Sequence, residues 1–353
     1  MKKVFLESHH LRNPYFGFGQ FNLHLIRALS QIPQDRIRFI IHGGEAAELG
    51  KSNNLGIKRY FSFRRYPLLR IRSRYDLWHA LNQNTRIEPY ARTPYLLTVH
   101  NITHIKDPRN YTEQAVHQRF QEKLNRSDAI TYISQYARDS THRFFKVPSV
   151  PEKVIYNGNP IEQILSLNGF RPVYLPERPF LFSIGEFTPR KNFGALIRMM
   201  PLLPHLDLII AGKNTTGEAA ELRELTRELG LEQRVHFPGK VSELEKQYLF
   251  QNCKAFVFPS LREGFGLPVI EAMKFEKPVF ISNNTSLPEV GGSAAFLWDN
   301  YEPEEMSRVF REGMKTYSEN EPTYRKKLRE RGDYFSWSRA AAQYLEVYES
   351  LLY

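Results

Sequence analysis

Two carboxylates flank a glycine-rich turn in the second half of the chain. Glu263 and Glu271 lie eight positions apart, and Gly264 and Gly266 stand between them. Glycine lets a ligand approach the backbone closely, because it has no side chain. Pro268 follows, and proline suits the first turn of a helix, where its missing N–H is not needed. The pattern therefore predicts a loop that enters a helix, with one carboxylate before the helix and one inside it.

The beginning of that predicted helix is suited to an anion. The backbone N–H groups of Phe265, Gly266 and Leu267 would lack partners within the helix, and the helix dipole favours negative charge beside them. Carboxylates repel phosphate but accept hydrogen bonds from hydroxyl groups. A phosphate between two sugar rings, with one glutamate facing each ring, would satisfy both requirements. The same spacing is equally compatible with an ordinary turn that carries two solvated glutamates.

The first half of the chain holds weaker candidates. Gly17 and Gly19 precede a predicted helix and could seat a phosphate, although the third glycine of a dinucleotide-binding fingerprint is absent. His100 follows a predicted strand, where a neutral imidazole could bind a hydroxyl or relay a proton. A lone histidine of this kind is also compatible with an ordinary loop residue. His9 and His10 show no metal-ligand spacing with a second cluster, so we expect them in a loop.

The elements that position these residues alternate along the chain. Short apolar runs alternate with amphipathic stretches, of which residues 19–29 show helical spacing. Continuous apolar strands separated by helices are typical of parallel sheets covered on both faces, so the predicted class is α/β. We predict strands at Val4–Leu6, Arg38–Ile41, Asp76–His79, Tyr95–Val99, Ala129–Ile133, Phe180–Ile184, Leu206–Ile210, Ala255–Phe258 and Pro278–Ile281.

Two domains are expected in a chain of 353 residues, because one core rarely grows that large. A dense turn signal at Asn157–Pro160 and a proline-rich stretch at Arg171–Pro179 predict a linker near residues 159–178. The expected domains are residues 1–160 and residues 175–337. Two parallel-sheet halves predict a ligand cleft between them, beside the carboxyl ends of the strands.

Composition narrows the class of protein. The single cysteine, Cys253, excludes an internal disulfide and a cysteine-based zinc site. No apolar run approaches the roughly 18 residues of a membrane span, and the polar N-terminus does not resemble a signal peptide, so we expect a cytoplasmic protein. The net charge of +11 favours polyanionic partners or simply solubility. A nucleic-acid-binding protein is therefore one alternative, but it gives no reason for two glutamates in a glycine-rich turn.

Several motifs together resemble one family. The stretch Pro259–Met273 resembles the E-x7-E motif of glycosyltransferase family 4 and related GT-B enzymes. The segments that resemble other family motifs, in the family's order, are Ser183–Asn192 (G-x-x-x-P-R-K-N), Phe237–Gly239 (an F-x-G turn), Ser286–Gly292 (L-P-E-x-x-G) and the tail from Phe335 to Tyr348. These segments cover nearly the whole second half of the chain.

The resemblance implies a GT-B fold, with two Rossmann-like domains whose parallel sheets face each other across a cleft. The N-terminal domain would bind the acceptor and the C-terminal domain the nucleotide-sugar donor. The last helix, residues 338–353, would pack back on the N-terminal domain. The family also implies retention of the anomeric configuration. Since the first half offers no convincing carboxylate nucleophile, we expect front-face substitution assisted by the leaving phosphate.

The resemblance also implies residue roles. Lys191 would hold the donor diphosphate, Glu271 would accept from the ribose hydroxyls, and Glu263 from hydroxyls of the transferred sugar. His100 would lie under the sugar, and Gly17 and Gly19 match a glycine-rich turn of the family. The implied donor-binding residues are Gly17, Gly19, Gly185, Lys191, Glu263, Gly264, Phe265, Gly266, Leu267 and Glu271, and the implied catalytic residues are His100, Arg190, Lys191 and Glu263.

One position departs from the family pattern. Many members carry an arginine directly after the glycine that corresponds to Gly185, and this chain has Glu186 there. Arg190 would supply the missing cation, or it would be a solvated neighbour of Lys191. A catalytically silent GT-B subunit therefore stays open as an alternative, although the intact Lys191 and E-x7-E motif argue against it.

The expected reaction needs no metal. The chain contains no D-x-D pair, the usual source of oxygen ligands for Mg²⁺ or Mn²⁺ in metal-dependent enzymes of this kind. We expect no cofactor, with the nucleotide sugar as a substrate. The first candidate for the donor is GDP-mannose and the second is a UDP-glucose type donor. The acceptor would be a glycan or a lipid-linked molecule in cell-surface polysaccharide or lipopolysaccharide synthesis.

A basic and aromatic stretch extends from Lys58 to Tyr75. It contains no acidic residue, and its seven cations alternate with aromatic and aliphatic residues that include Tyr60 and Ile71. Pro67 argues against one continuous helix, so we expect a loop with a helical turn. Cations and aromatics suit an anionic membrane surface, which would make the protein peripheral on the inner face of the membrane. A solvated loop that only binds an anionic acceptor is equally compatible.

Overall fold

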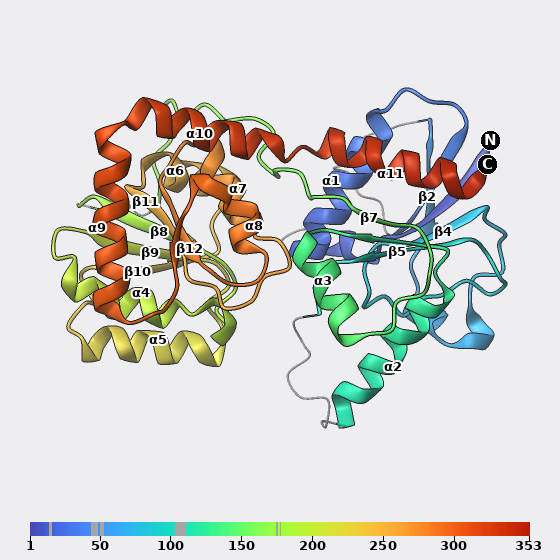
Figure 1. The fold of residues 1–353 in the computed structure, drawn as a ribbon, viewed down its shortest axis with the longest axis horizontal. Helices are drawn as coiled ribbons and strands as arrows, with labels where there is room; N and C mark the ends of the chain where they lie inside the picture. Colours follow the sequence, from blue (N-terminus) through green and yellow to red (C-terminus); the bar gives the residue numbers. More distant parts are fainter. Residues whose placement is uncertain (14–15, 44–48, 50–52, 103–110, 174–175, 177) are drawn as a thin grey trace. The chain divides into compact units, whose positions relative to one another are not determined.

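The computed structural model describes residues 1–13, 16–43, 49, 53–102, 111–173, 176 and 178–353 (Figure 1). The chain forms two compact units. Unit 1 consists of Met1–Pro160 together with Phe335–Tyr353, and unit 2 consists of Ile161–Tyr334. The division thus follows Pro160, at the start of the linker expected near residues 159–178, of which residues 174, 175 and 177 lie outside the described part. The C-terminal segment that belongs to unit 1 begins at Phe335.

Unit 1 is built on one parallel sheet with the strand order β3-β2-β1-β4-β5-β6-β7. Its strands are β1 (Lys2–Glu7), β2 (Ile37–Gly43), β3 (Leu55–Arg59), β4 (Leu77–Ala80), β5 (Tyr95–Val99), β6 (Ala129–Tyr132) and β7 (Glu152–Val154). Strands β1, β4, β5 and β6 are almost wholly buried, which is why their sequences read as continuous apolar runs. The order changes direction between β1 and β4, and all the carboxyl ends lie at one edge.

Helices cover both faces of this sheet, with α1 and α11 on one face and α2 and α3 on the other (Figure 1). The helices of unit 1 are η1 (His9–Arg12), α1 (Gly17–Gln31), η3 (Ser62–Arg65), η4 (Pro67–Leu69), α2 (Tyr111–Arg126), α3 (Gln135–Phe144) and α11 (Trp337–Leu352). The last of them, α11, packs along α1 and reaches β4. A helix from the end of the chain is therefore part of the first unit's core.

A chain of buried hydrogen bonds fastens α11 to the sheet. The ring of His79 on β4 contacts the hydroxyl of Tyr348 through Nδ1 at 2.8 Å and that of Thr98 on β5 through Nε2 at 2.7 Å. Thr98 also contacts Thr131 on β6 at 2.7 Å and Tyr344 on α11 at 3.2 Å. Burial lowers the pKa of His79 to about 3, so the ring is neutral at physiological pH.

Unit 2 is built on a six-stranded parallel sheet with the order β10-β9-β8-β11-β12-β13. Its strands are β8 (Phe180–Ile184), β9 (Asp207–Ala211), β10 (Val235–Gly239), β11 (Ala255–Phe258), β12 (Val279–Ser282) and β13 (Phe296–Trp298). Its helices are η5 (Pro189–Lys191), α4 (Phe193–Met199), η6 (Met200–Leu202), α5 (Gly217–Glu228), α6 (Glu243–Asn252), α7 (Leu267–Lys274), α8 (Leu287–Gly291), η7 (Gly292–Ala294), α9 (Pro303–Glu319) and α10 (Glu321–Tyr334).

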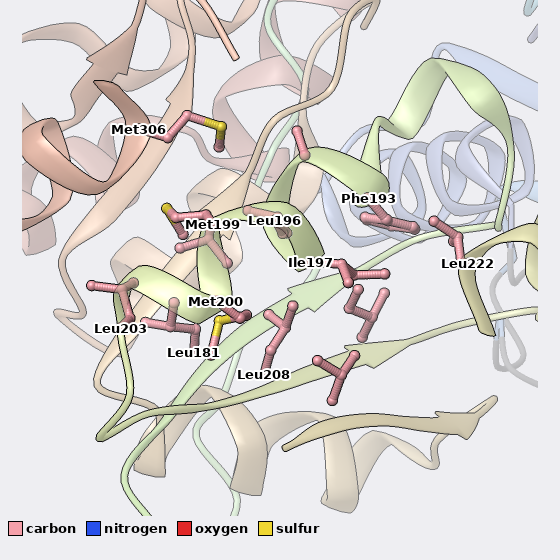
Figure 2. Packing of buried hydrophobic residues seen from close by; sticks show 14 of the residues in the cluster. Leu181, Phe193, Leu196, Ile197, Met199, Met200, Leu203, Leu208, Leu222 and Met306 are labelled. Atoms are coloured by element: carbon pink, nitrogen blue, oxygen red, sulfur yellow. The ribbon is translucent and has the colours of Figure 1, made fainter. Parts of the chain in front are cut away.

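One hydrophobic cluster of unit 2 lies between the sheet and α4. Leu196 and Ile197 of α4 pack with Leu181 of β8 and Leu208 of β9, and Met306 of α9 joins the same cluster (Figure 2). Helices α4 and α5 cover one face of the sheet, and α6, α7 and α10 cover the other (Figure 1). The predicted α/β class with two Rossmann-like parallel-sheet units is thus confirmed.

All nine predicted strands are present, and the strands that the sequence did not predict are edge strands. They are β3, β7, β10 and β13, which end the two sheets on either side. Edge strands bury only part of their surface, so they need no continuous apolar run. The segment Phe237–Gly239, read from the sequence as a turn, belongs to β10. Lys58 and Arg59, expected in a loop, belong to β3.

Candidate active site

The loop between β11 and α7 follows the predicted course. Helix α7 begins at Leu267, with Pro268 in its first turn, and Glu271 lies inside it. Gly266 precedes the helix with φ of 109°, a conformation that favours glycine. A Cβ atom at Gly266 would also lie only 2.7 Å from Cδ2 of Leu287. Close packing against the start of α8 therefore requires glycine at this position.

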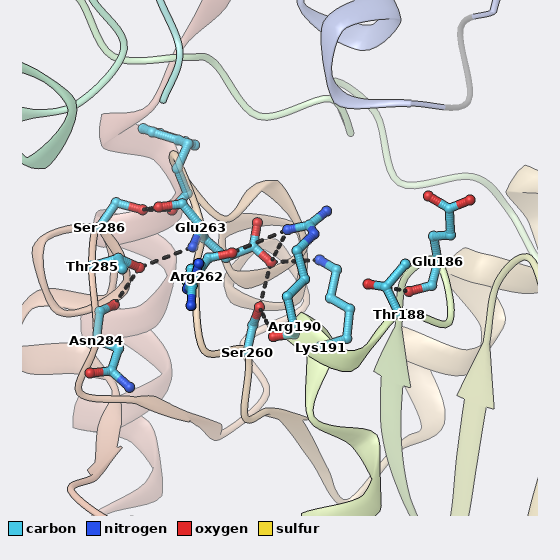
Figure 3. Close-up of polar contacts among 11 residues, drawn as sticks. Glu186, Thr188, Arg190, Lys191, Ser260, Arg262, Glu263, Asn284, Thr285 and Ser286 are labelled. Atoms are coloured by element: carbon cyan, nitrogen blue, oxygen red, sulfur yellow. Dashed lines mark hydrogen bonds and ion pairs between the residues drawn. The ribbon is translucent and has the colours of Figure 1, made fainter. Parts of the chain in front are cut away.

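A buried ion pair joins this loop to the loop after β8. Nζ of Lys191 lies 2.6 Å from Oε1 of Glu263, and the Lys191 residue is only 6% exposed (Figure 3). The hydroxyl of Ser260 donates to the same carboxylate oxygen at 2.6 Å. Arg190, whose side chain is 45% exposed, contacts that oxygen at 3.3 Å. Three of the residues implied by the family resemblance thus form one cluster.

The electrostatics of the pair favour an added anion. Burial opposes the charge of the Glu263 carboxylate, but Lys191 and Arg190 outweigh it, so the pKa of Glu263 lies below its usual value. Burial lowers the pKa of Lys191, and the charge of Glu263 opposes that shift. The Lys191 ammonium also lies 4.5 Å above the ring of Phe258. A diphosphate beside Lys191 would stabilise an ammonium that burial disfavours.

The loop that carries Glu263 is held by the loop after β12. The backbone N–H of Glu263 donates to Oγ1 of Thr285 at 3.0 Å. The hydroxyl of Ser286 donates to the backbone carbonyls of Glu263 and Phe265, both at 3.0 Å. The sequence reading assigned no role to Thr285 or Ser286, although Ser286 opens the L-P-E-x-x-G motif. Their role here is to fix the backbone that presents Glu263 (Figure 3).

Glu271 belongs to a separate network. Its Oε1 lies 2.9 Å from Nζ of Lys246 on α6, which also contacts Glu243 at 2.9 Å. Burial alone would lower the pKa of Lys246, but the two carboxylates outweigh it and raise it to about 12. Glu271 is only 6% exposed. Lys246 was not predicted from the sequence, because nothing in the pattern links α6 to α7.

A second unpredicted lysine lies beside Glu186, the residue that departs from the family pattern. Gly185 follows β8, and a Cβ atom there would lie 3.0 Å from Cε of Lys191, so the lysine stem lies close against this backbone. Glu186 points away from the Lys191 cluster (Figure 3) and contacts Lys213, with Nζ 3.3 Å from Oε1. Lys213 follows β9, the neighbour of β8. A cation is thus present near the position where the family pattern has an arginine.

In unit 1, the first turn of α1 lies beside His100. Gly17 and Gly19 both belong to this turn, where the backbone N–H groups lack partners within the helix. The ring of Phe18 lies 4.8 Å from that of His100, and the ring of Phe21 lies 4.5 Å from it, both edge-on. The structure therefore brings together the three unit 1 residues that the family resemblance implied.

His100 is a neutral hydrogen-bond partner. Burial lowers its pKa to about 3, although a hydrogen bond to the backbone carbonyl of Leu81 opposes the shift. That bond, 2.8 Å long, is donated by Nε2–H, so Nδ1 carries the lone pair. A neutral Nδ1 of this kind accepts a hydrogen bond from a hydroxyl group.

Among the residues that the structure describes, no group of three or more His, Cys, Asp or Glu side chains is placed to hold a metal ion. In the same part of the chain, no helix is both long and apolar enough to cross a membrane.

Comparison with known proteins identifies the family. The model of the "Glycosyl transferases group 1" family matches residues 171–333, and that of "Glycosyltransferase Family 4" matches residues 22–163. The chain is 27% identical to O-antigen chain mannosyltransferase B of Escherichia coli, over 99% of this chain and 100% of that protein. It is 30% identical to the serotype-specific mannosyltransferase WbdA of Escherichia coli, over 65% of this chain but only 30% of that protein.

Solved structures agree on the fold. The crystal structure of Alr3699/HepE from Anabaena in complex with UDP and glucose aligns with a TM-score of 0.72 and 20% identity, over 99% of this chain and all of that one. The two family models between them cover most of the chain, one in each unit. The chain is therefore a GT-B glycosyltransferase and belongs to the group 1 and family 4 glycosyltransferases.

Proposed function

We propose that the protein is a retaining mannosyltransferase that uses GDP-mannose, with an acceptor in cell-surface polysaccharide or lipopolysaccharide synthesis. The observation that carries the proposal is the buried pair of Lys191 and Glu263 beside the start of α7. It combines a cation for a diphosphate with a carboxylate for sugar hydroxyls. The two mannosyltransferase relatives support mannose as the transferred sugar.

In this proposal each group of unit 2 has a role at the donor. Lys191 stabilises the negative charge that develops on the leaving diphosphate, and the N–H groups at the start of α7 add to it. Glu263 accepts hydrogen bonds from the sugar, and Glu271, held by Lys246, accepts from the ribose. The acceptor hydroxyl attacks the anomeric carbon on the side that the diphosphate leaves, and a phosphate oxygen takes its proton. Configuration is retained without a covalent intermediate.

Glucose from UDP-glucose is the second candidate for the donor. It is supported by the solved neighbour from Anabaena, whose structure contains UDP and glucose. A thermal-shift panel of GDP, UDP and ADP with their sugars separates the candidates. A ligand at about 100 times its Kd adds about 2.7 kcal/mol to stability. NMR of the product with the preferred donor then reports the anomeric configuration. No shift with any nucleotide, or an inverted product, contradicts the proposal.

A second part of the proposal concerns docking on a membrane. The residues involved form a mostly exposed wedge, defined as Phe63, Arg64, Arg65, Tyr66, Leu68 and Leu69, of which Arg64 is half-buried. Its apolar side chains are unusually open to solvent, with Leu68 84% exposed and Tyr66 52% exposed. The guanidinium of Arg64 lies 5.0 Å from the ring of Phe61, and that of Arg65 lies 5.1 Å from the ring of Tyr66. These cations therefore accompany aromatic rings, as suits the interface between lipid headgroups and acyl chains.

The structure shows which residues of the basic stretch expected from the sequence lie at the surface. Ile71 is 5% exposed and belongs to the core of unit 1, so it is not available to a membrane. The expected loop with a helical turn consists of two short helices, η3 and η4, the second beginning at Pro67. We propose that the wedge docks unit 1 on an anionic leaflet and thereby brings the enzyme to a lipid-linked acceptor.

Liposome sedimentation tests this docking. The parent protein should bind vesicles that contain phosphatidylglycerol, and should bind less in high salt or to phosphatidylcholine alone. The double variant Arg64→Ser/Arg65→Ser should bind about tenfold or more weakly, since each cation beside an anionic leaflet contributes about 1 kcal/mol. Arg143→Ser/Phe144→Ser removes another exposed cation–aromatic pair, on α3, and is the matched control. Equal loss in the control, or no binding by the parent at low salt, contradicts the docking.

A further inference from the structure

A buried carboxylate lies where the sheet of unit 1 changes direction. Glu7 is the last residue of β1, which has β2 on one side and β4 on the other. Open parallel sheets bind ligands outside the carboxyl ends of their strands at such a switch point. Glu7 is fully buried, and the mechanism proposed above makes no use of it.

Two histidines share the Glu7 carboxylate. Nδ1 of His42, at the end of β2, lies 3.0 Å from Oε1, and Nδ1 of His9 lies 3.0 Å from both oxygens. Burial alone would raise the pKa of Glu7, but the hydrogen bonds from the two rings outweigh it and lower the pKa to about 2. The carboxylate is therefore ionised at physiological pH and fixes the orientation of both rings.

His9 is the member of this group that a ligand can reach. His42 is fully buried, whereas the His9 side chain is 23% exposed. An ionised carboxylate accepts from Nδ1–H, so the other nitrogen, Nε2, carries the lone pair when the ring is neutral. His9 therefore presents a hydrogen-bond acceptor at the carboxyl edge of the sheet, with its tautomer set by Glu7.

A row of rings continues from His9 towards His100, which the family resemblance places under the sugar. The ring of His9 lies 5.2 Å from that of Tyr60 and 4.1 Å from that of His10. His10 lies 5.1 Å from Phe18, which in turn lies 4.8 Å from His100. Burial and the neighbouring His9 lower the pKa of His10 to about 4, against the opposing charge of Glu7. His10 and His100 are therefore neutral, and the apolar faces and polar edges of the row suit a sugar ring.

A buried amide with one unpaired donor lies at the same edge. Asn82 follows β4 and is fully buried, and its Oδ1 accepts from the backbone N–H of Asn84. Within the described residues, its Nδ2 has no hydrogen-bond partner. A buried amide donor without a partner costs free energy, which a hydroxyl group could recover.

We propose that His9, oriented by Glu7, forms an acceptor subsite that binds a hydroxyl of a sugar acceptor, with the rings of Tyr60 and His10 beside it. The hydroxyl donates to Nε2 of His9. A free phosphate would be disfavoured there, because the nearest buried charge is the carboxylate of Glu7. The inference rests on the proposed glycosyl transfer, since it assigns the acceptor rather than the donor.

Two substitutions of His9 distinguish the roles of its two ring nitrogens. In His9→Asn the amide keeps a donor for Glu7 but loses the acceptor at the far edge, whereas His9→Gln keeps an oxygen near the position of Nε2. With octyl α-mannoside as acceptor, His9→Asn should raise the acceptor KM or lower kcat/KM by about 3- to 10-fold, the scale of one neutral hydrogen bond. His9→Gln should recover part of the loss. Affinity for GDP and UDP by calorimetry should not change in either variant.

His142 provides a matched control. Its Nε2 contacts Glu152 at 2.7 Å, so it is also a carboxylate–histidine pair of unit 1, between α3 and β7 rather than at the switch point. His142→Asn should leave acceptor kinetics unchanged. An effect of His9→Asn on nucleotide affinity, an effect equal to that of His142→Asn, or no effect on acceptor kinetics would overturn the inference.

A binding measurement keeps the inference testable without turnover. In NMR spectra of the parent protein with ¹³C-labelled histidine rings, octyl α-mannoside should shift the His9 signal and leave the His142 signal in place. Failure of the proposed function would give a different result. The parent protein would bind no nucleotide sugar, while octyl α-mannoside would still shift the His9 signal. Nucleotide binding with an unmoved His9 signal, up to the solubility of the mannoside, overturns the acceptor subsite alone.

Discussion

Lys191 and Glu263 are separated by 72 positions in the chain, yet their charged atoms lie 2.6 Å apart in a buried pair. The lysine follows β8 and the glutamate follows β11, which are neighbouring strands. The pair is therefore a direct consequence of parallel strand order, which places both loops at one edge of the sheet. Each charge is largely buried against the other, so replacing either residue leaves its partner with an uncompensated charge.

Replacing the lysine of this pair should affect both stability and turnover. Lys191→Met should lower kcat at least about 100-fold, the scale for removing a stabiliser of a developing anion. It should also lower the unfolding free energy by about 3–5 kcal/mol, because the carboxylate of Glu263 stays buried without its ion pair to Lys191. Adding Glu263→Gln should recover part of that stability in urea denaturation. Arg190→Met is the control and should cost less than about 1 kcal/mol, since Arg190 is partly solvated. Parent-like turnover of Lys191→Met at saturating donor would remove Lys191 from the site.

The two glutamates of the E-x7-E motif should differ in what they bind. Glu271→Gln should weaken binding of the free nucleoside diphosphate by about 10- to 100-fold, the scale of a hydrogen bond to a charged group. Glu263→Gln should spare the free nucleotide and weaken only the nucleotide sugar. Calorimetry with both ligands measures the difference. Glu243→Gln, which removes only the second partner of Lys246, should bind as the parent does. Equal effects of both substitutions on the free nucleotide would contradict the division of roles.

Lys213 should act as a cation of the donor site. Lys213→Ala should lower kcat/KM for the donor by about 3- to 10-fold, a moderate effect because its side chain is 42% exposed. Glu186→Gln should have the opposite or no effect, since it frees Lys213 from its partner. Lys315→Ala on α9, 78% exposed, is the control. If Lys213→Ala has the same kcat/KM as the parent at low salt, Lys213 is not a cation of the donor site.

Chelation should not abolish transfer. We expect activity to survive EDTA, because cations and a helix N-terminus take the place of a metal in stabilising the diphosphate. The measurement is the initial rate with and without EDTA, followed by addition of Mg²⁺ or Mn²⁺. Loss of activity that either ion restores would contradict the prediction.

Stability should decrease as the pH falls below about 6.5. The pKa values of His79 and His100 are lowered to about 3 by burial, from 6.5 as the reference value, so the unfolded chain takes up protons that the folded chain does not. Each such histidine contributes a slope of about 1.4 kcal/mol per pH unit, with full stability above pH 6.5. The lowered pKa of Glu7 affects the unfolding free energy only when the pH falls below its reference value of 4.5.

Urea denaturation between pH 4.5 and 7 checks this window. His79→Gln should reduce the slope of unfolding free energy against pH, and His205→Gln, at an exposed position, should not. Identical slopes for the parent and His79→Gln would show that burial does not hold His79 neutral.

The central strands of both sheets and the loop that enters α7 were predictable from the sequence. Buried parallel strands must be apolar on both faces, so β1, β5, β8 and β11 appear as continuous apolar runs. The glycines and proline before α7 reflect local backbone geometry, which neighbouring residues determine. The carboxylates and Lys191 could be recognised because their motifs are short and contiguous.

Only the tertiary structure decided which charges meet. The pairs Glu186–Lys213, Glu271–Lys246 and Glu7–His42 join residues that are 27, 25 and 35 positions apart. These residues lie on loops, helices or strand ends whose neighbours depend on strand order. The edge strands β3, β7 and β10 likewise depend on what lies beside them, since their sequences are not continuously apolar. The fourth edge strand, β13, is apolar but only three residues long. Hydrophobic periodicity reports whether a residue is buried, but it carries no information about the partner across the sheet. That information arises when strand order and register bring distant loops to the same edge.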